Sequence, residues 1–184
     1  MRKHVCVPNL RVQFAHGLAS SPFGNKAKLF AQHFDAFTPE MDTRNLELCV
    51  RVHEQALEKF RPDLLIGSSF GGAIAVALLE RGVWRGPTLL LAQAARNYMP
   101  SCRLPDGVRV TIVHAVEDEV VDVEGSRALA KTGTPALVEL IEVNDDHALA
   151  ALVESGELIR LVHRAVSAVP ELHEKADPRT PSQR

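Results

Sequence analysis

The clearest chemical pattern in the chain lies near residue 69, where the sequence reads Gly67-Ser68-Ser69-Phe70-Gly71-Gly72. This segment has the form G-x-S-x-G, in which a serine occupies a sharp turn between a strand and a helix. The flanking glycines allow the helix and the strand to approach closely, because they carry no side chains that collide. Such a turn exposes the Ser69 hydroxyl beside the free N–H groups of a helix N-terminus. The pattern therefore favours acyl transfer, with Ser69 attacking a carbonyl carbon.

Two other interpretations of this segment have to be compared with the first. A phosphate-binding loop has a lysine after its glycines, whereas Ala73 and Ile74 follow here, and the dinucleotide pattern G-x-G-x-x-G is also absent. A glycine-rich turn without chemistry remains the simpler alternative. Ser68 is a rival hydroxyl, but it lacks a glycine two residues away on each side, so we expect it to pack rather than react.

A serine hydroxyl is a weak nucleophile until a histidine takes its proton and a carboxylate orients that histidine. Five of the eight histidines lie near the termini or in helix-like stretches, where a solvated or packed imidazole is ordinary: His4, His33, His53, His163 and His173. Three remain, namely His16, His114 and His147. His147 follows the last predicted strand through a polar turn, which places it at the carboxyl edge of the sheet. We therefore predict His147 as the base, with helix capping as its structural alternative, and interpret His114 as a strand-end residue.

The predicted acid is Asp118, which follows a strand and precedes the apolar pair Val120-Val121 that anchors its loop. Its rivals in the same acidic segment are Glu117, Glu119 and Asp122, and a solvated acidic turn is the alternative for each of them. Chain order favours Asp118. Nucleophile, acid and histidine then follow one another along the chain, each after a different strand.

The elements that must position these residues are apolar runs alternating with helix-like stretches, which is typical of a parallel sheet covered on both faces. We predict an α/β three-layer sandwich with a mostly parallel sheet of about six strands. The predicted strands span residues 10–15, 34–38, 64–67, 88–92, 108–114 and 137–143. The predicted helices run from Asp42 or Thr43 to Phe60, from 70 to 81, from 124 to 131 and from 147 to 166. The second and third are each followed by a glycine, Gly82 and Gly133, and the last can divide at 155–157.

Composition limits the possible partners and locations. The 184 residues are 46% hydrophobic, which suits one domain over 1–170, followed by a polar tail over 171–184 that we expect to be flexible. The net charge of -2 argues against nucleic acid as a partner, and no segment approaches the roughly 20 apolar residues of a membrane span. Three widely spaced cysteines form neither a disulfide framework nor a zinc motif, so we expect a reducing, cytoplasmic location.

With these residues placed, the sequence resembles the α/β-hydrolase superfamily, and within it the small bacterial serine esterases without a lid domain. The resemblance covers residues 10 to about 166. It rests on four segments: Phe14 to Pro22, which is similar to the family's His-Gly loop, the turn Gly67 to Gly72, the acid loop Asp118 to Val121, and the histidine loop Asp146 to Ala148. It implies a triad of Ser69, Asp118 and His147, and an oxyanion hole formed by the backbone N–H groups of Leu18 and Phe70.

The resemblance also implies that His16 shapes the first loop and that Arg96 contacts the substrate, with a surface arginine as the alternative for the latter. Compared with the full family pattern, the chain lacks the first two strands and the lid, which predicts an open site and small ester or thioester substrates. No cofactor or metal is implied. Two rival functions remain open: a noncatalytic binding protein of the same fold, and a metal-assisted hydrolase with ligands from His114, Asp118, Asp146 and His147.

Overall fold

The computed structural model describes residues 10–167, and its central element is a sheet of six strands in the order β2-β1-β3-β4-β5-β6. Every neighbouring pair of strands is parallel. The strands are β1 (Arg11–Ala15), β2 (Asp35–Phe37), β3 (Leu64–Ser68), β4 (Thr88–Leu91), β5 (Val110–Ala115) and β6 (Val138–Val143). All six predicted strands are therefore present, with ends that differ from the prediction by at most two residues.

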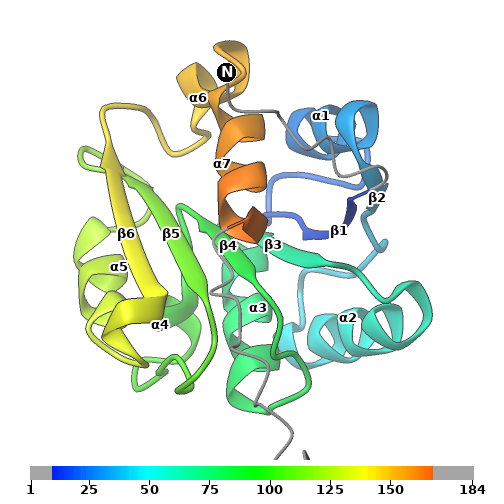
Figure 1. The fold of residues 1–184 in the computed structure, drawn as a ribbon, viewed down its shortest axis with the longest axis horizontal. Helices are drawn as coiled ribbons and strands as arrows, with labels where there is room; N and C mark the ends of the chain where they lie inside the picture. Colours follow the sequence, from blue (N-terminus) through cyan, green and yellow to red (C-terminus); the bar gives the residue numbers. More distant parts are fainter. Residues whose placement is uncertain (1–9, 168–184) are drawn as a thin grey trace, which may run out of the picture.

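Helices cover both faces of this sheet, with α1, α6 and α7 on one face and α2, α3, α4 and α5 on the other (Figure 1). The helices are α1 (Asn25–His33), α2 (Leu46–Phe60), α3 (Phe70–Glu80), α4 (Ala95–Tyr98), α5 (Val123–Ala130), α6 (Ala150–Glu154) and α7 (Glu157–Ser167), with the 3₁₀ turn η1 (Pro135–Leu137) before β6. The predicted three-layer α/β class is confirmed, with a sheet that is parallel throughout.

Two helix starts differ from the prediction. The cap of α2 is Asn45, whose side chain accepts a hydrogen bond from the Leu48 N–H, whereas the Asp42 carboxylate accepts hydrogen bonds from Arg44. The prediction of a cap at Asp42 or Thr43 was therefore wrong. The last helical region begins at residue 150 rather than at 147, which leaves His147 in a loop, and it divides before Glu157 as expected.

The helices α1 and α4 were not predicted. α4 has only four residues, and α1 has Gly24 as its N-cap and therefore no side-chain cap, so neither helix has a strong local signal. The predicted tail at 171–184 lies outside the described residues. Within residues 10–167, no helix is long and apolar enough to cross a membrane.

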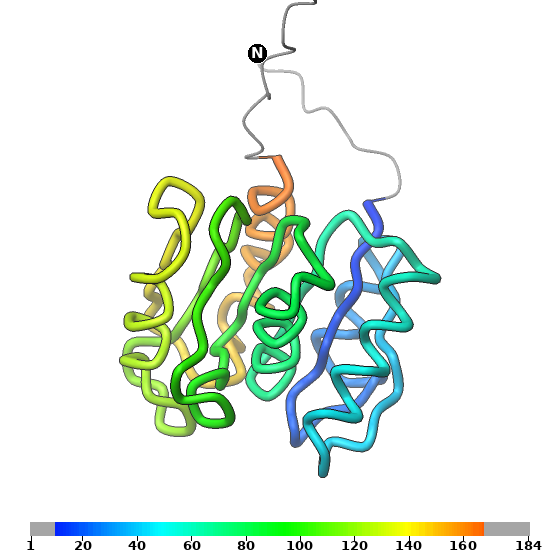
Figure 2. Tube along the Cα trace, turned by 90° about the horizontal axis from the view of Figure 1, so that it is seen from below, coloured from blue at the N-terminus to red at the C-terminus, as the bar shows by residue number. Residues whose placement is uncertain are grey.

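The strand order reverses between β1 and β3, because the chain runs from β1 outward to β2 and then crosses back to continue from β3 to β6. Figure 2 shows this path from the side covered by α2 and α3, with β1 in blue and β6 in yellow. In open α/β sheets, ligands bind at such a switch point, beside the carboxyl ends of the strands. Here the switch brings the loop after β1 next to the turn after β3.

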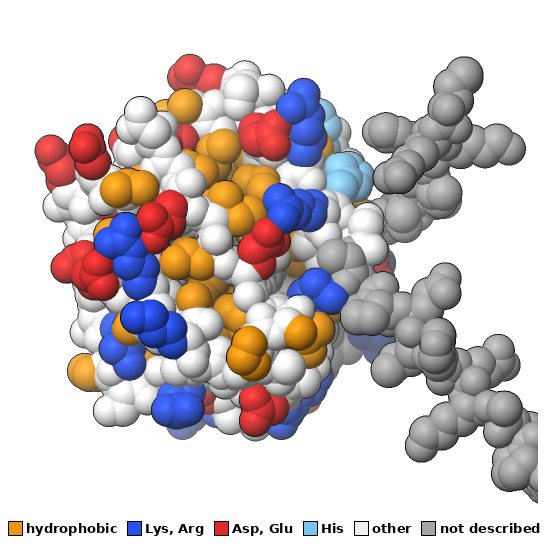
Figure 3. Space-filling model, turned by 60° about the vertical axis from the view of Figure 1, so that its left-hand side comes forward, with side chains coloured by type: hydrophobic (Ala, Val, Ile, Leu, Met, Phe, Trp, Pro, Cys, Tyr) orange, Lys and Arg blue, Asp and Glu red, His pale blue; other side chains and the backbone are white. Residues whose placement is uncertain are grey.

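The edge of the sheet at β6 is lined by ion pairs. Arg127 of α5 binds Glu142, and Arg164 of α7 binds Glu139, so each pair ties one outer helix to the edge strand. On this side of the molecule hydrophobic side chains alternate with acidic and basic ones (Figure 3). Charged side chains along an exposed edge oppose pairing with another strand.

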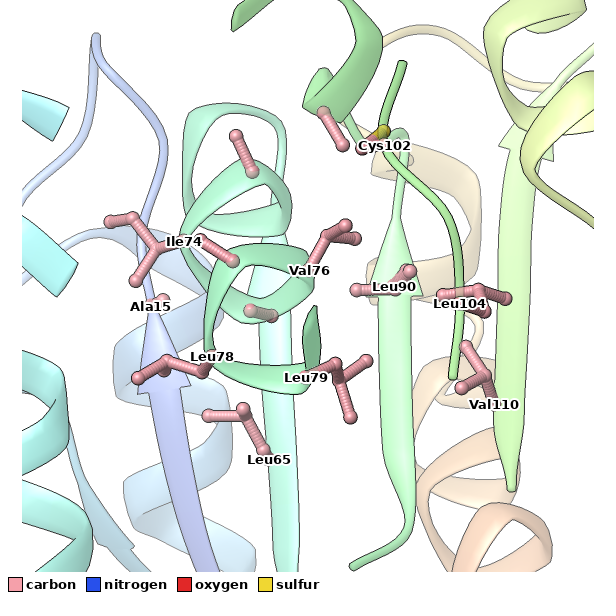
Figure 4. Packing of buried hydrophobic residues seen from close by; sticks show 14 of the residues in the cluster. Ala15, Leu65, Ile74, Val76, Leu78, Leu79, Leu90, Cys102, Leu104 and Val110 are labelled. Atoms are coloured by element: carbon pink, nitrogen blue, oxygen red, sulfur yellow. The ribbon is translucent and has the colours of Figure 1, made fainter. Parts of the chain in front are cut away.

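The helix that carries the Ser69 turn is buried along nearly its whole length. Residues 70–79 of α3 are all buried, and Figure 4 shows Ile74, Leu78 and Leu79 packed between the strands and their neighbouring segments. A side chain at Gly71 would place its Cβ 1.9 Å from the carbonyl oxygen of Ala15. The N-terminus of α3 is thus pressed directly against the end of β1, which fixes the position of the turn before it.

Candidate active site

Ser69 lies between β3 and α3 with a backbone conformation that few non-glycine residues adopt, at φ 54° and ψ −117°. Hydrogen bonds hold this strained turn on both sides. The Ser69 N–H donates to the Leu91 carbonyl at 2.9 Å, and its own carbonyl accepts from Gly72 and Ala94 at 2.9 and 3.0 Å. Ser68, the rival hydroxyl, is the buried last residue of β3, as predicted.

The structure brings together the three side chains that the sequence singled out. His147 Nε2 lies 3.0 Å from Ser69 Oγ, and His147 Nδ1 lies 2.7 Å from Asp118 Oδ2. A carboxylate can only accept, so Nδ1 carries the ring proton and Nε2 is left to accept from the Ser69 hydroxyl. The three residues come from the loops after β3, β5 and β6, which meet at the carboxyl edge of the sheet.

Asp118 is held as an ionised carboxylate. Its Oδ1 accepts the N–H groups of Val120 and Val121, both at 2.9 Å. Burial by itself raises the pKa of Asp118, but the hydrogen bonds from Val121, His147 and Val120 outweigh burial and lower the pKa below its ordinary value. A permanent negative charge therefore faces the His147 ring.

The three rival acids have other positions. Asp122 caps α5 by accepting the Glu124 N–H at 2.9 Å, and Glu117 and Glu119 are exposed to solvent. Of the four acids, Asp118 is the one whose carboxylate accepts the N–H groups two and three residues further on and contacts His147. His114 was interpreted as a strand-end residue, and as a ligand only in the rival metal-assisted hydrolase. It is fully buried in β5, and its Nε2 lies 3.2 Å from Asp118 Oδ2, a contact for which the spacing of four residues was the only sequence signal.

The loop after β1 runs beside the Ser69 hydroxyl. A Cβ at Gly17 would lie 3.3 Å from Ser69 Cβ and 3.8 Å from Ser69 Oγ. His16 is buried, and its Nδ1 lies 2.9 Å from the Gly17 carbonyl oxygen, so its ring braces this loop. Leu18 follows Gly17, while Phe70 is the first residue of α3, which places both residues of the predicted oxyanion hole on segments adjoining Ser69.

Arg96 lies on α4, where it is half-buried beside Gly125 of α5. Its predicted contact with substrate remains a prediction. Asp146, which belonged to the ligand set of the rival metal-assisted hydrolase, accepts the N–H of Ala150, the first residue of α6, at 3.1 Å. Among residues 10–167, no group of three or more histidine, cysteine or acidic side chains is arranged to hold a metal ion.

A separate open pocket of about 460 Å³ lies between β2 and α2, with Phe37 and Phe60 among its lining residues. The rings of these two residues contact each other, with centroids 5.6 Å apart. None of the three residues Ser69, Asp118 and His147 lines it. The chemistry of the site described above therefore does not take place in this pocket.

No family model and no curated protein matches the sequence. Solved structures do match. An esterase from Pyrococcus furiosus has a TM-score of 0.65 at 14% identity, covering 86% of this chain and 82% of that one. The chain has the α/β-hydrolase fold. A monoacylglycerol lipase from Paleococcus ferrophilus matches with a TM-score of 0.65 at 13% identity over 85% and 94% of the two chains. A protein of the alpha/beta superfamily from Xanthomonas campestris has 25% identity and a TM-score of 0.58 over 82% and 98%.

The fold that the resemblance to the α/β-hydrolase superfamily implied is therefore confirmed. Among residues 10–167 the first strand, β1, already carries the His-Gly loop, so the sheet that these residues form lacks the two strands that precede this loop in the full pattern. Between β4 and β5 the chain forms only the short helix α4 and turns. This segment is the one that carries the lid in the full pattern, and here it forms none.

Proposed function

We propose that this protein is a serine hydrolase that cleaves small ester or thioester substrates through an acyl-enzyme on Ser69. The observation that carries the proposal is the continuous series of hydrogen bonds from Ser69 Oγ through His147 to Asp118, at 3.0 and 2.7 Å. The strained backbone at Ser69 and the α/β-hydrolase fold support it. So does the chemistry of the similar structures, which are described as an esterase and a lipase.

In the proposed first step, His147 Nε2 takes the hydroxyl proton as Ser69 Oγ attacks the carbonyl carbon of the substrate. The carbonyl oxygen becomes an oxyanion, which the backbone N–H groups of Leu18 and Phe70 stabilise. The protonated His147 then gives its proton to the leaving alcohol or thiol, and the acyl group stays on Ser69. Asp118 remains ionised and stabilises the imidazolium.

In the second step a water molecule gives a proton to His147 and attacks the acyl-enzyme. The tetrahedral intermediate collapses, the Ser69 oxygen takes the proton back from His147, and the carboxylic acid leaves. The chain needs no further group to balance these two steps. Each proton that His147 accepts is returned within the same step.

The surroundings of the site favour a short acyl chain. Leu18 is 51% exposed and Val120 is 67% exposed, and they lie on the two loops that adjoin Ser69 and Asp118. These side chains supply apolar surface without enclosing it, since the segment between β4 and β5 forms no lid over the site. We expect activity on short-chain and activated esters.

The two described cysteines, Cys49 and Cys102, are buried free thiols, which agrees with the cytoplasmic location predicted from the cysteine pattern.

The test is hydrolysis of p-nitrophenyl esters from acetate to decanoate, together with labelling by a fluorophosphonate. Ser69→Ala should lower kcat by a factor on the order of 10⁴ or more, because the nucleophile is lost, and it should abolish labelling. Ser68→Ala is the matched control, since it removes a neighbouring buried hydroxyl and should keep activity. An unlabelled wild type without turnover would instead favour a noncatalytic binding protein, and undiminished hydrolysis by Ser69→Ala would refute the role of Ser69.

A further inference from the structure

His147 lies in the β6–α6 loop, residues 144–149, which joins the edge strand of the sheet to a short helix. Two aspartates of this loop, Asp145 and Asp146, accept the N–H groups of the first three residues of α6 at 3.0 to 3.1 Å. These bonds hold the part of the loop that leads into α6. They do not involve the carbonyl group that directly follows His147.

That carbonyl group belongs to Ala148, and it accepts a hydrogen bond from the side chain of Lys26. Lys26 lies in α1, 122 residues earlier in the chain, and its Nζ is the donor. Within residues 10–167, the other hydrogen bonds to the backbone of residues 145–149 come from the loop itself or from α6. Lys26 is thus the donor that connects this backbone to another element.

Apolar packing joins the same two segments. Leu149 is fully buried and shares a hydrophobic cluster with Ala27 and Phe30 of α1, on the face of the sheet that α1, α6 and α7 cover (Figure 1). Its backbone is left-handed, at φ 55°, a conformation that a leucine keeps only where its surroundings hold it. Because Lys26 precedes Ala27 and Ala148 precedes Leu149, a polar contact and an apolar contact together attach the β6–α6 loop to α1.

The Lys26 ammonium gives up part of its contact with water to make this bond. The side chain is half-buried, and burial lowers the pKa of Lys26 below its ordinary value, although Asp146 and Asp145 oppose this effect. Fixing a long side chain also costs conformational entropy. A lysine that met neither of these costs with a partner would extend into water, as an exposed lysine does, so the bond to Ala148 is what holds the ammonium in this place.

The helix that carries Lys26 is itself tied to the other side of the site. α1 continues from the loop after β1, which contains Gly17 and Leu18, and a Cβ at Gly17 would lie 3.3 Å from Ser69 Cβ. The β6–α6 loop places His147 Nε2 3.0 Å from Ser69 Oγ. The hydrogen bond from Lys26 therefore connects two segments that both reach Ser69, one with the predicted oxyanion hole and one with the base.

We propose that Lys26 is a positioning residue for His147, which it holds in place through the carbonyl group of Ala148. The inference rests on the proposed function, because it assigns Lys26 a part in setting up the same triad. The His147 ring has to meet two distances at once, 3.0 Å to Ser69 Oγ and 2.7 Å to Asp118 Oδ2. A displacement of about 1 Å disturbs both hydrogen bonds and slows proton transfer, although Lys26 touches neither the substrate nor the reacting atoms.

The test compares kcat and KM for a short p-nitrophenyl ester in Lys26→Met, Lys26→Arg and Lys28→Met. Methionine keeps most of the apolar stem of lysine without a donor, whereas arginine keeps a charged donor on a long stem. We expect Lys26→Met to lower kcat about 10-fold or more and to change KM by less than about 2-fold, because the bond orients the base and touches no substrate. Lys26→Arg should recover most of the lost kcat.

Lys28→Met is the matched control, because Lys28 is an exposed lysine of the same helix and its loss changes the net charge equally. It should keep the wild-type kcat and KM. Equal values of kcat in Lys26→Met and Lys28→Met would overturn the inference. So would a loss of kcat that is as large in Lys26→Arg as in Lys26→Met, because packing of the lysine stem, rather than its donor, would then be responsible.

A second measurement does not depend on turnover. Amide hydrogen exchange, followed by mass spectrometry, reports how firmly residues 144–153 are held in the wild type and in the two methionine variants. We expect faster exchange of this segment in Lys26→Met, because the released loop opens more often, and wild-type exchange in Lys28→Met. Wild-type exchange in both variants would overturn the inference. Faster exchange in Lys26→Met of a protein that hydrolyses no ester would support the contact with the loop and refute the proposed function alone.

Discussion

At the scale of single residues, the site depends on which carboxylate the acidic loop presents. Asp118 turns back on its own loop, and the N–H groups of Val120 and Val121 hold Oδ1 while Oδ2 faces the imidazoles. The sequence could rank Asp118 first because the chain order of nucleophile, acid and histidine is specific. It could not reveal the buried hydrogen bonds that join Gln93, Ser126 and His114, because these bonds depend on contacts between the segment after β4, β5 and α5 that no local pattern encodes.

Asp118→Asn should lower kcat on the order of 10⁴-fold without unfolding the protein, since an amide no longer stabilises the imidazolium or fixes the right tautomer of His147. Asp122→Asn is the matched control in the same loop. Asparagine caps helices as well as aspartate does, so α5 keeps its N-terminus and activity should stay within a few-fold of wild type. Steady-state kinetics of both variants decide between the two acids. Loss of activity in Asp122→Asn alone would reverse the assignment.

At the scale of elements, the strands were predictable because a parallel strand buried on both faces is a continuous apolar run. β3, β4 and β5 are buried at every position. Helix starts and short helices were predicted less well than the strands. Asn45 and Asp42 are equally good caps by type, and only the path of the chain into α2 decides between them. Glycine in the turn before α3 was correctly interpreted as a requirement for close approach.

Two glycine-to-alanine changes test that requirement at different helices. In Gly71→Ala the new methyl group would lie 1.9 Å from the Ala15 carbonyl oxygen, and backbone cannot yield as a flexible side chain does. We expect a loss of several kcal/mol in the free energy of unfolding, with a displaced Ser69 turn and lost activity. In Gly125→Ala, within α5, the nearest atom is 3.9 Å away, so we expect a gain of about 0.5–1 kcal/mol.

Urea denaturation of both variants, monitored by circular dichroism, measures the two effects. Opposite signs are the expected result. Equal and small changes in both would mean that the N-terminus of α3 does not depend on contact with the end of β1, and the account of how the sheet positions Ser69 would have to be revised.

At the scale of the whole molecule, the change of folding stability with pH depends on a histidine that plays no part in the proposed reaction. His53 of α2 is fully buried against β1, where Gln13 Nε2 lies 3.2 Å from its Nδ1 and 3.0 Å from its carbonyl oxygen. Burial, aided by repulsion from His16, lowers the pKa of His53 from 6.5 to about 3. The sequence placed His53 on a helix but could not show that this side of the helix is inaccessible to solvent.

The lowered pKa has a definite consequence for acid stability. Below pH 6.5 the unfolded chain protonates this histidine while the folded protein does not, so the stability that a neutral His53 provides is complete above pH 6.5 and declines as the pH falls towards 3. Between pH 7.5 and pH 5 the loss from this one group amounts to about 2 kcal/mol. Asp118 contributes in the same direction, but its lowered pKa acts only below 3.8, outside this range.

Urea unfolding of the wild type and His53→Leu at pH 7.5 and pH 5 isolates the effect. The variant has a lower stability at pH 7.5, because Gln13 loses a partner, but the fall between the two pH values should be smaller by about 2 kcal/mol than in the wild type. His163→Gln is the control, since His163 is a histidine exposed on α7. If the wild type and His53→Leu lost equal stability between pH 7.5 and pH 5, His53 would have to be accessible to protons in the folded state, and the packing of α2 against β1 would be looser than its contacts indicate.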